Sequence, residues 1–160
     1  MRRAGLLICG VLLAGLAGWG VWSLVRGPSR DRVLAGAKDV DRIVVVHGTL
    51  GQTAAKYGTP AFEVRGADAT QDFLRTVDWI GPTGACACGG NYRIDLYRGD
   101  QLLLRLGYHH GRFLRLDPRW GTDVEMTEHS RQAVGDWFAR RGFSGFREVL
   151  EDEPGWGQRN

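Results

Sequence analysis

Lysine is scarce in this sequence, and its positive charge comes almost entirely from arginine. Only Lys38 and Lys56 are lysines among the 21 basic residues, and 18 acidic residues leave a formal net charge of +3. The chain has no basic helix and no block of basic residues that would follow a phosphate backbone. The sequence therefore predicts no nucleic-acid partner.

Recognisable catalytic motifs are also missing. The chain has no G-x-S-x-G elbow, no phosphate-binding loop, no zincin motif and no calcium loop. It holds only three cysteines, and none of them forms a thioredoxin-type C-x-x-C motif. With 24% charged and 43% hydrophobic residues, the composition is that of a folded protein. These observations favour a folded domain that is not an enzyme.

A long apolar run is present at the N-terminus. Residues 4–25 carry no charge and follow Arg2 and Arg3. About 20 apolar residues cross a bilayer as a helix. The run also continues well past Ala17, where a cleaved signal peptide would have its small-residue site. We therefore expect residues 1–26 to be a transmembrane signal-anchor in the lipid bilayer.

Small residues recur at every fourth position of this run, at Gly10, Ala14 and Gly18. Such a stripe lets two membrane helices approach closely, although these residues are common in membrane helices generally. The pattern is compatible with a homo-oligomer formed through the membrane helix.

The arginines at the start of the chain favour a cytoplasmic N-terminus, although further basic residues follow the apolar run. We expect a single-pass protein of the cell membrane with an extracytoplasmic domain. The glycine and proline of residues 27–38 are typical of a linker. The domain is then expected over residues 39–150, and a polar tail over residues 151–160.

Hydrophobic periodicity predicts an α+β domain with the element order ββαβββα. Two strands are expected near Ile43–Val46 and Phe62–Val64. A helix follows, with Asp68 as its N-cap and with Gly81 and Pro82 as its end. The last helix begins after Thr127.

Three alternating segments after residue 91 predict an antiparallel meander packed on the helices. Aligning their apolar faces pairs Leu96 with Leu102 and Ile94 with Leu104. The next turn is then a three-residue loop, His-His-Gly, with Gly111 in the left-handed conformation.

Two cysteines separated by one residue, Cys86 and Cys88, precede the meander. The same alignment brings them to one end of the sheet, close to His109 and His110. Two thiolates and two imidazoles form the ligand set of a zinc or copper site. However, zinc sites usually separate paired cysteines by two or more residues.

Three other interpretations of the cysteines remain open. They form a strained disulfide, they act as a redox dithiol whose thiol pKa a histidine lowers, or they are small residues packed at a turn. Asp117 and Asp123 are expected in a loop on either side of Trp120, without a catalytic role.

The stretch from Cys86 to Gly142 resembles uncharacterised bacterial proteins. The shared pattern is C-x-C-x-G, then HHG-x-x-L-R, a tryptophan, an aspartate, T-x-x-S and a final tryptophan. The resemblance implies no activity and no catalytic residue. It implies that the cysteines, the two histidines, Gly111, Arg115 and Trp120 belong to one recurring unit.

Together these features predict a membrane-anchored binding or structural module with an unknown protein or ligand partner. The alternative is a metal-binding or dithiol redox protein that uses Cys86, Cys88, His109 and His110.

Overall fold

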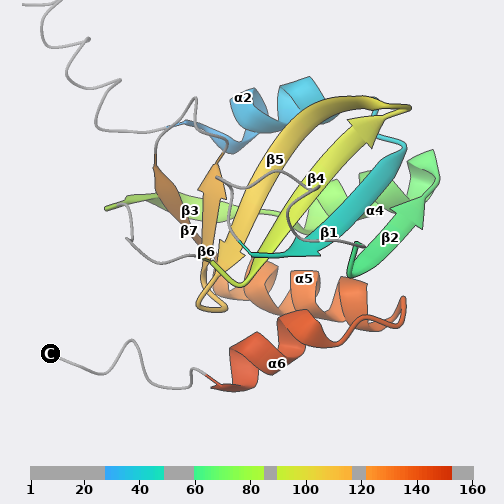
Figure 1. Cartoon of the computed structure of the whole chain (residues 1–160). Coiled ribbons are helices and arrows are strands. Elements are labelled where there is room, and N and C mark those ends of the chain that lie inside the picture. The colour runs from blue at the N-terminus through green and yellow to red at the C-terminus, as the bar shows by residue number, and fades with distance from the viewer. Residues whose placement is uncertain (1–27, 49–59, 85–89, 117–121, 153–160) are drawn as a thin grey trace, which may run out of the picture.

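The computed structural model describes residues 28–48, 60–84, 90–116 and 122–152. In these ranges the chain forms a seven-stranded antiparallel sheet with helices packed against it (Figure 1). The strand order across the sheet is β2-β1-β4-β5-β6-β7-β3. The elements are α2 (Arg30–Leu34), the 3-10 helix η1 (Ala35–Ala37), β1 (Arg42–His47), β2 (Phe62–Arg65), α4 (Ala67–Thr76), β3 (Trp79–Thr83), β4 (Tyr92–Arg98), β5 (Gln101–His109), β6 (Phe113–Leu116), β7 (Asp123–Met126), α5 (Glu128–Ala139) and α6 (Gly145–Asp152). The predicted α+β class with an antiparallel sheet is confirmed.

Strands β4 to β7 form a meander that includes the three predicted strands. The pairing of β4 with β5 differs from the prediction by two residues, because Leu96 lies opposite Leu104 and Ile94 opposite Leu106. The turn accounts for one of these residues, because Arg98 lies opposite Gln101, and an irregularity between Leu96 and Tyr97 accounts for the other. A shift by an even number of residues leaves every side chain on its own face. The predicted apolar face is correct for Ile94, Leu96, Leu104 and Leu106, which are buried, whereas Leu102 lies opposite Tyr97 and is 38% exposed.

The turn between β5 and β6 lies at the end of the sheet where the sequence predicts a site. His109 lies opposite Phe113, which leaves His110, Gly111 and Arg112 in the loop, one residue later than the predicted His-His-Gly. Gly111 has a φ of 61°, so its predicted left-handed conformation is confirmed. His110 also has a positive φ, 53°, which is uncommon for a residue with a side chain.

All the described helices cover the same face of the sheet. In Figure 1, α5 and α6 lie next to each other along one side of it. Aromatic rings fill this layer, and Phe138 of α5 stacks on Phe146 of α6 with 4.2 Å between ring centroids. The core contains helix residues and meander residues in contact. The helices contribute Phe73, Trp137, Phe138 and Phe146, and the meander contributes Ile94, Leu104, Leu106 and Leu114.

The predicted helix after residue 66 is shorter than the sequence suggests. It ends at Thr76, and Trp79–Thr83 forms strand β3 on the edge of the sheet. The backbone between them is fixed by α5, since the hydroxyl of Ser130 accepts from the N–H of Asp78 and donates to the carbonyl of Thr76. An edge strand also tolerates the proline that was expected to end the helix.

The start of the same helix differs by two residues from the prediction. Its N-cap is Gly66, which has a φ of 113°, and Asp68 lies in the first turn. An acidic residue in the first turn still favours the helix, because the N-terminal end of the helix dipole is positive.

Part of the segment predicted as a linker is folded. Residues Arg30–Ala37 form α2 and η1, and they bury Val33, Leu34 and Ala37 in the core. Arg30 donates from Nε to the carbonyl of Val77 at 2.6 Å and from Nη2 to that of Leu74 at 2.9 Å. The folded part thus begins within a few residues of the apolar run.

None of the helices in the described ranges is long and apolar enough to cross a membrane. The predicted membrane span over residues 4–25, with Gly10, Ala14 and Gly18, lies outside the described residues.

Candidate functional site

The face of the sheet opposite the helices carries buried charged residues. Asp95 on β4 lies directly opposite Arg105 on β5. Arg105 donates to both oxygens of Asp95, at 2.7 and 3.2 Å. Arg93 lies 3.1 Å from the same carboxylate, and Asp95 and Arg93 are each only 1% exposed. A buried carboxylate needs such partners, because burial of an unpaired charge is very unfavourable.

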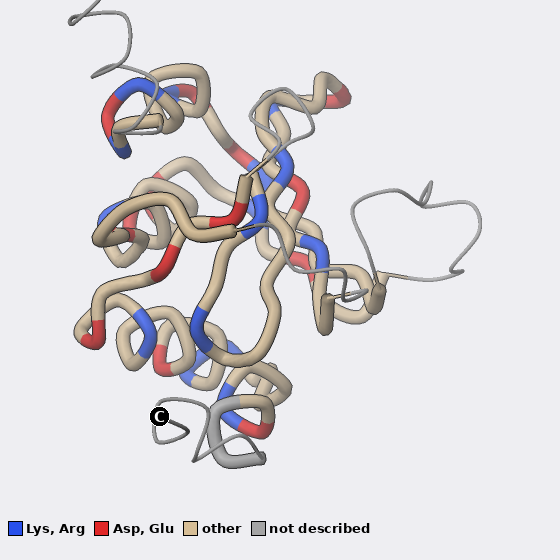
Figure 2. Tube along the Cα trace, turned by 90° about the vertical axis from the view of Figure 1, so that its left-hand side faces the viewer, with Lys and Arg blue, Asp and Glu red and all other residues tan. Residues whose placement is uncertain are grey.

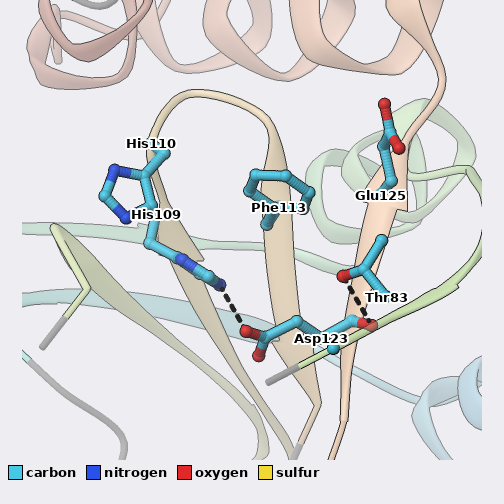
Figure 3. Close-up of a pocket in the computed structure, with 7 residues that line it drawn as sticks. Thr83, His109, His110, Phe113, Asp123 and Glu125 are labelled. Carbon is cyan, nitrogen blue, oxygen red and sulfur yellow. Dashed lines mark hydrogen bonds and ion pairs between the residues drawn. The ribbon is translucent and has the colours of Figure 1, made fainter. Parts of the chain in front are cut away.

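A second pair of the same kind lies two strands away. Asp123 on β7 lies opposite Arg115 on β6, which donates from Nε to Oδ1 at 2.7 Å and from Nη2 to Oδ2 at 3.0 Å. Asp123 is 1% exposed. Here the third group is a histidine: Nε2 of His109 lies 3.4 Å from Oδ2 of Asp123 (Figure 3).

His109 is uncharged at neutral pH in this arrangement. Burial lowers its pKa to about 4, because desolvation disfavours the imidazolium more strongly than Asp123 favours it. The nearby charges of Arg115 and His110 lower the pKa further. A neutral imidazole with one nitrogen facing a carboxylate has a fixed orientation and offers hydrogen bonding without a charge.

A pocket opens where the β5–β6 turn meets β7 and the end of β3. Its volume is about 360 Å³, and Figure 3 shows most of the side chains around it. Its described walls are formed by Thr83, Gly84, His109, His110, Phe113, Asp123 and Glu125. A cavity of this size, with a few converging polar groups, is typical of a site for a small molecule.

Glu125 and Phe113 lie directly opposite each other on β7 and β6. Arg112 donates to Oε1 of Glu125 from Nε at 2.8 Å and from Nη2 at 2.5 Å. The ring of Phe113 lies 5.6 Å from the ring of His109. The pocket therefore has an aromatic side as well as its carboxylates.

The two histidines that the sequence singles out do come together in this pocket. Their ring centroids are 5.4 Å apart, and the backbone N–H of His110 donates to the side chain of Asn91 at 2.9 Å. Gly111 follows them in the turn, and Arg115 holds Asp123. Cys86, Cys88 and Trp120 lie outside the described residues.

In the described ranges no group of three or more His, Cys, Asp or Glu side chains is arranged to hold a metal ion. The residues that flank the cysteine segment do border the site. Gly84 lines the pocket, and a Cβ placed on Gly90 would lie 3.9 Å from Cβ of His109. The last pair of β4 and β5 at this end is Tyr92 with Tyr108, and the backbone N–H of Asn91 donates to the carbonyl of Tyr108, so the chain before β4 leads toward the histidines.

Sequence reasoning missed Asp123 and Glu125 as parts of the site. The signal for them is the alternation in Asp-Val-Glu-Met, where Val124 and Met126 are buried in the core and the two acids face the other side. The segment follows a stretch with a proline and a glycine and has only two apolar residues, so the sequence predicts a loop there.

Comparisons with known proteins identify no relative. No family model, no curated protein and no solved structure matches the chain. The resemblance over Cys86 to Gly142 therefore stays a prediction, and the function is inferred from the geometry of the site.

Proposed function

We propose that this chain is a single-pass, membrane-anchored protein whose extracytoplasmic domain binds a small ligand in the pocket beside the β5–β6 turn. The anchor is the apolar run of residues 4–25. The domain acts as a binding module and not as an enzyme.

The observation that carries the proposal is the presence of buried polar side chains in the wall of an open cavity. His109 and Asp123 are each 1% exposed and line a pocket of about 360 Å³. Burying polar groups lowers stability unless their interactions compensate for it. Ligand pockets typically combine an apolar lining with a few precisely placed polar groups, which is the arrangement of these residues.

The charged groups of the pocket favour binding over catalysis. Asp123 is held by Arg115 through two hydrogen bonds, and Glu125 is held by Arg112. A carboxylate paired with a guanidinium is a poor general base, because the cation stabilises its ionised form. The same pairs fix both side chains, as a rigid binding site requires.

A pocket-filling variant tests the proposal. No heavy atom lies within 4 Å of a Cβ placed on Gly84, so a side chain introduced there has open space beside the pocket. We expect the full chain in detergent to bind members of a fragment mixture in ligand-observed NMR. Gly84→Phe should abolish that binding while the melting temperature is retained.

The matched control is Gly36→Phe. Gly36 lies in η1, is exposed, and also has no heavy atom within 4 Å of an added Cβ. Its substitution should leave fragment binding unchanged. Fragment binding that survives Gly84→Phe, or no fragment binding by the unmodified chain, would refute the pocket as the site.

A second candidate function is the binding of a soft metal ion or dithiol redox chemistry by Cys86 and Cys88 with His109 and His110. Its support is that Gly84 lines the same pocket as both histidines and that Gly90 lies against His109. A neutral imidazole is also the form that binds a metal.

Metal analysis and thiol titration test this candidate. It predicts a stoichiometric metal ion, or a pair of thiols that titrates reversibly between oxidised and reduced forms, and loss of either in Cys86→Ala/Cys88→Ala. If the native chain holds no metal, its thiols show no reversible oxidation and the double variant is equally stable, the cysteines are turn residues only.

A further inference from the structure

The charges on the pocket wall are unevenly distributed. Two of the described lining residues, Asp123 and Glu125, carry carboxylates, and none is a lysine or an arginine. Both arginines that neutralise these acids, Arg115 and Arg112, are absent from that set of lining residues. The acidic and aromatic residues thus belong to the pocket wall, and Arg112 lies beside them, bonded to Glu125 and with its guanidinium carbon 5.8 Å from the centre of the Phe113 ring.

Glu125 has unused capacity as an acceptor. Both donors of Arg112 converge on Oε1, so Oε2 receives no hydrogen bond within the described part of the chain. The side chain is 26% exposed and belongs to the pocket wall. A carboxylate oxygen in this position is suited to a donor that the ligand brings.

Phe113 provides the second feature that a cation recognises. Its ring lines the pocket, directly across the sheet from Glu125. Figure 3 shows the ring between the two histidines and Glu125. The face of an aromatic ring is negative and attracts an ammonium group, and this attraction strengthens where water is excluded.

We propose that the pocket binds a small organic ammonium ion, with its cationic group between the carboxylate of Glu125 and the ring of Phe113. This inference rests on the proposed function and names the chemical class of its ligand. One carboxylate and one ring face are enough to recognise an organic cation, whereas a bare metal ion needs several converging ligands. The neutral imidazole of His109 adds no repulsion at neutral pH.

Three probes of nearly equal shape test the charge preference. Choline is the cation, 3,3-dimethylbutan-1-ol is its neutral isostere, and 3,3-dimethylbutanoate is the anion. Their affinities for the full chain in detergent are measured by ligand-observed NMR at neutral pH and physiological salt. We expect choline to bind about tenfold more tightly than the alcohol, as expected for a partly desolvated cation–π contact with a carboxylate nearby. The anion should bind most weakly.

Two variants assign the preference to its residues. Glu125→Gln removes the charge, and Phe113→Leu removes the ring while it keeps an apolar side chain. Each should reduce the ratio of choline to alcohol affinity by about threefold or more, with smaller effects on the alcohol itself. Because the readout is a ratio within one variant, a general loss of stability does not imitate the result.

The outcomes separate the inference from the function on which it rests. If the alcohol or the anion binds as tightly as choline, the pocket is a ligand site but its ligand is not a cation. If choline is preferred and Glu125→Gln leaves the ratio unchanged, Glu125 does not bind the cation and the inference fails. If none of the three binds at millimolar concentration while fragments still bind, the ammonium proposal fails alone. If fragments also fail to bind, the pocket itself is refuted.

Discussion

Asp123 and Arg115 lie directly opposite each other on neighbouring strands and form two parallel hydrogen bonds on the face of the sheet that the helices leave open. Asp95 and Arg105 repeat this relationship on β4 and β5. Both aspartates are 1% exposed and both arginines 23% exposed. The two pairs differ in the third group at the carboxylate, which is Arg93 for Asp95 and His109 for Asp123. One pair therefore serves as an internal control for the other.

Neutralising either aspartate should lower the free energy of unfolding. Asp123→Asn and Asp95→Asn each leave a partly buried guanidinium without its counter-charge, and we expect a loss of about 2 to 4 kcal/mol. Urea unfolding of the full chain followed by tryptophan fluorescence measures the loss.

Only one of the two substitutions should affect the pocket. Asp123 lines it, whereas Asp95 does not. Fragment binding should therefore be lost in Asp123→Asn and persist in Asp95→Asn under conditions where both remain folded. Equal losses of binding would mean that the pairs act only through stability.

The sequence predicts the apolar side of this sheet better than its polar side. Ile94, Leu96, Leu104 and Leu106 share one face despite the error in register, because a shift of two residues preserves the side on which each residue points. The irregularity at Leu96 and Tyr97 has no signal in the alternation, so the exact partners were wrong. The charged residues of the other face are expected to be exposed from the sequence alone. Their burial follows from pairing with charged residues on neighbouring strands.

Stability should depend on pH through His109. Its pKa is about 4 in the folded chain, against about 6.5 in an unfolded one. About one unit above pH 6.5 and higher, the histidine is neutral in both states and adds no pH dependence. As the pH falls from about 6.5 to about 4, the unfolded state binds the proton first, so the folded state loses up to about 3 kcal/mol.

The difference between the native chain and His109→Gln isolates this contribution from other groups. In the presence of a metal chelator, the free energy of unfolding should fall more steeply with decreasing pH for the native chain than for His109→Gln. The NMR signal of the His109 ring should also stay unchanged down to about pH 5. A midpoint near 6.5 for that signal would contradict the burial of the imidazole.

Arg30 should stabilise the domain although it lies in a segment predicted as a linker. It donates to the carbonyls of Leu74 and Val77, at and just beyond the end of α4. Arg30→Ala leaves these acceptors without their donor, and we expect a loss of about 1 to 2 kcal/mol. The control is Arg75→Ala, since Arg75 is 71% exposed and makes only a surface ion pair with Asp72.

Chemical denaturation of both variants measures the difference, and the control should change stability by less than about 0.5 kcal/mol. Similar small effects in both would show that α2 contributes little. The glycine and proline ahead of α2 are typical of a linker, and the buried residues of α2 form too short a pattern to predict a helix.

One part of the site is conspicuous in the sequence, and the other part has only a short alternating pattern. His109 and His110 were identified because two histidines beside a turn glycine are conspicuous. Asp123 became part of the site only through β7, a four-residue strand that pairs with both β6 and β3. Non-local pairing of this kind follows from the whole sheet and not from neighbouring residues.

The orientation in the membrane should follow the arginines at the start of the chain. Arg2 and Arg3 directly precede the apolar run, and positive charge next to a membrane helix favours the cytoplasmic side. Arg30, on the other side of the run, donates to the carbonyls of Leu74 and Val77 at the end of α4 and is part of the folded domain. We therefore expect the C-terminus outside the cytoplasm, and a C-terminal alkaline phosphatase fusion should be active, whereas a fluorescent-protein fusion should be dark.

Substitutions of Arg2 and Arg3 test whether their positive charge determines the orientation in the membrane. Arg2→Glu/Arg3→Glu should reduce phosphatase activity, and Arg2→Lys/Arg3→Lys should keep it, because only the charge is read. A fluorescent fusion with an inactive phosphatase in the native chain would instead place the domain in a reducing compartment. A Cys86–Cys88 disulfide would then not persist, and the cysteines would act as thiols or as metal ligands.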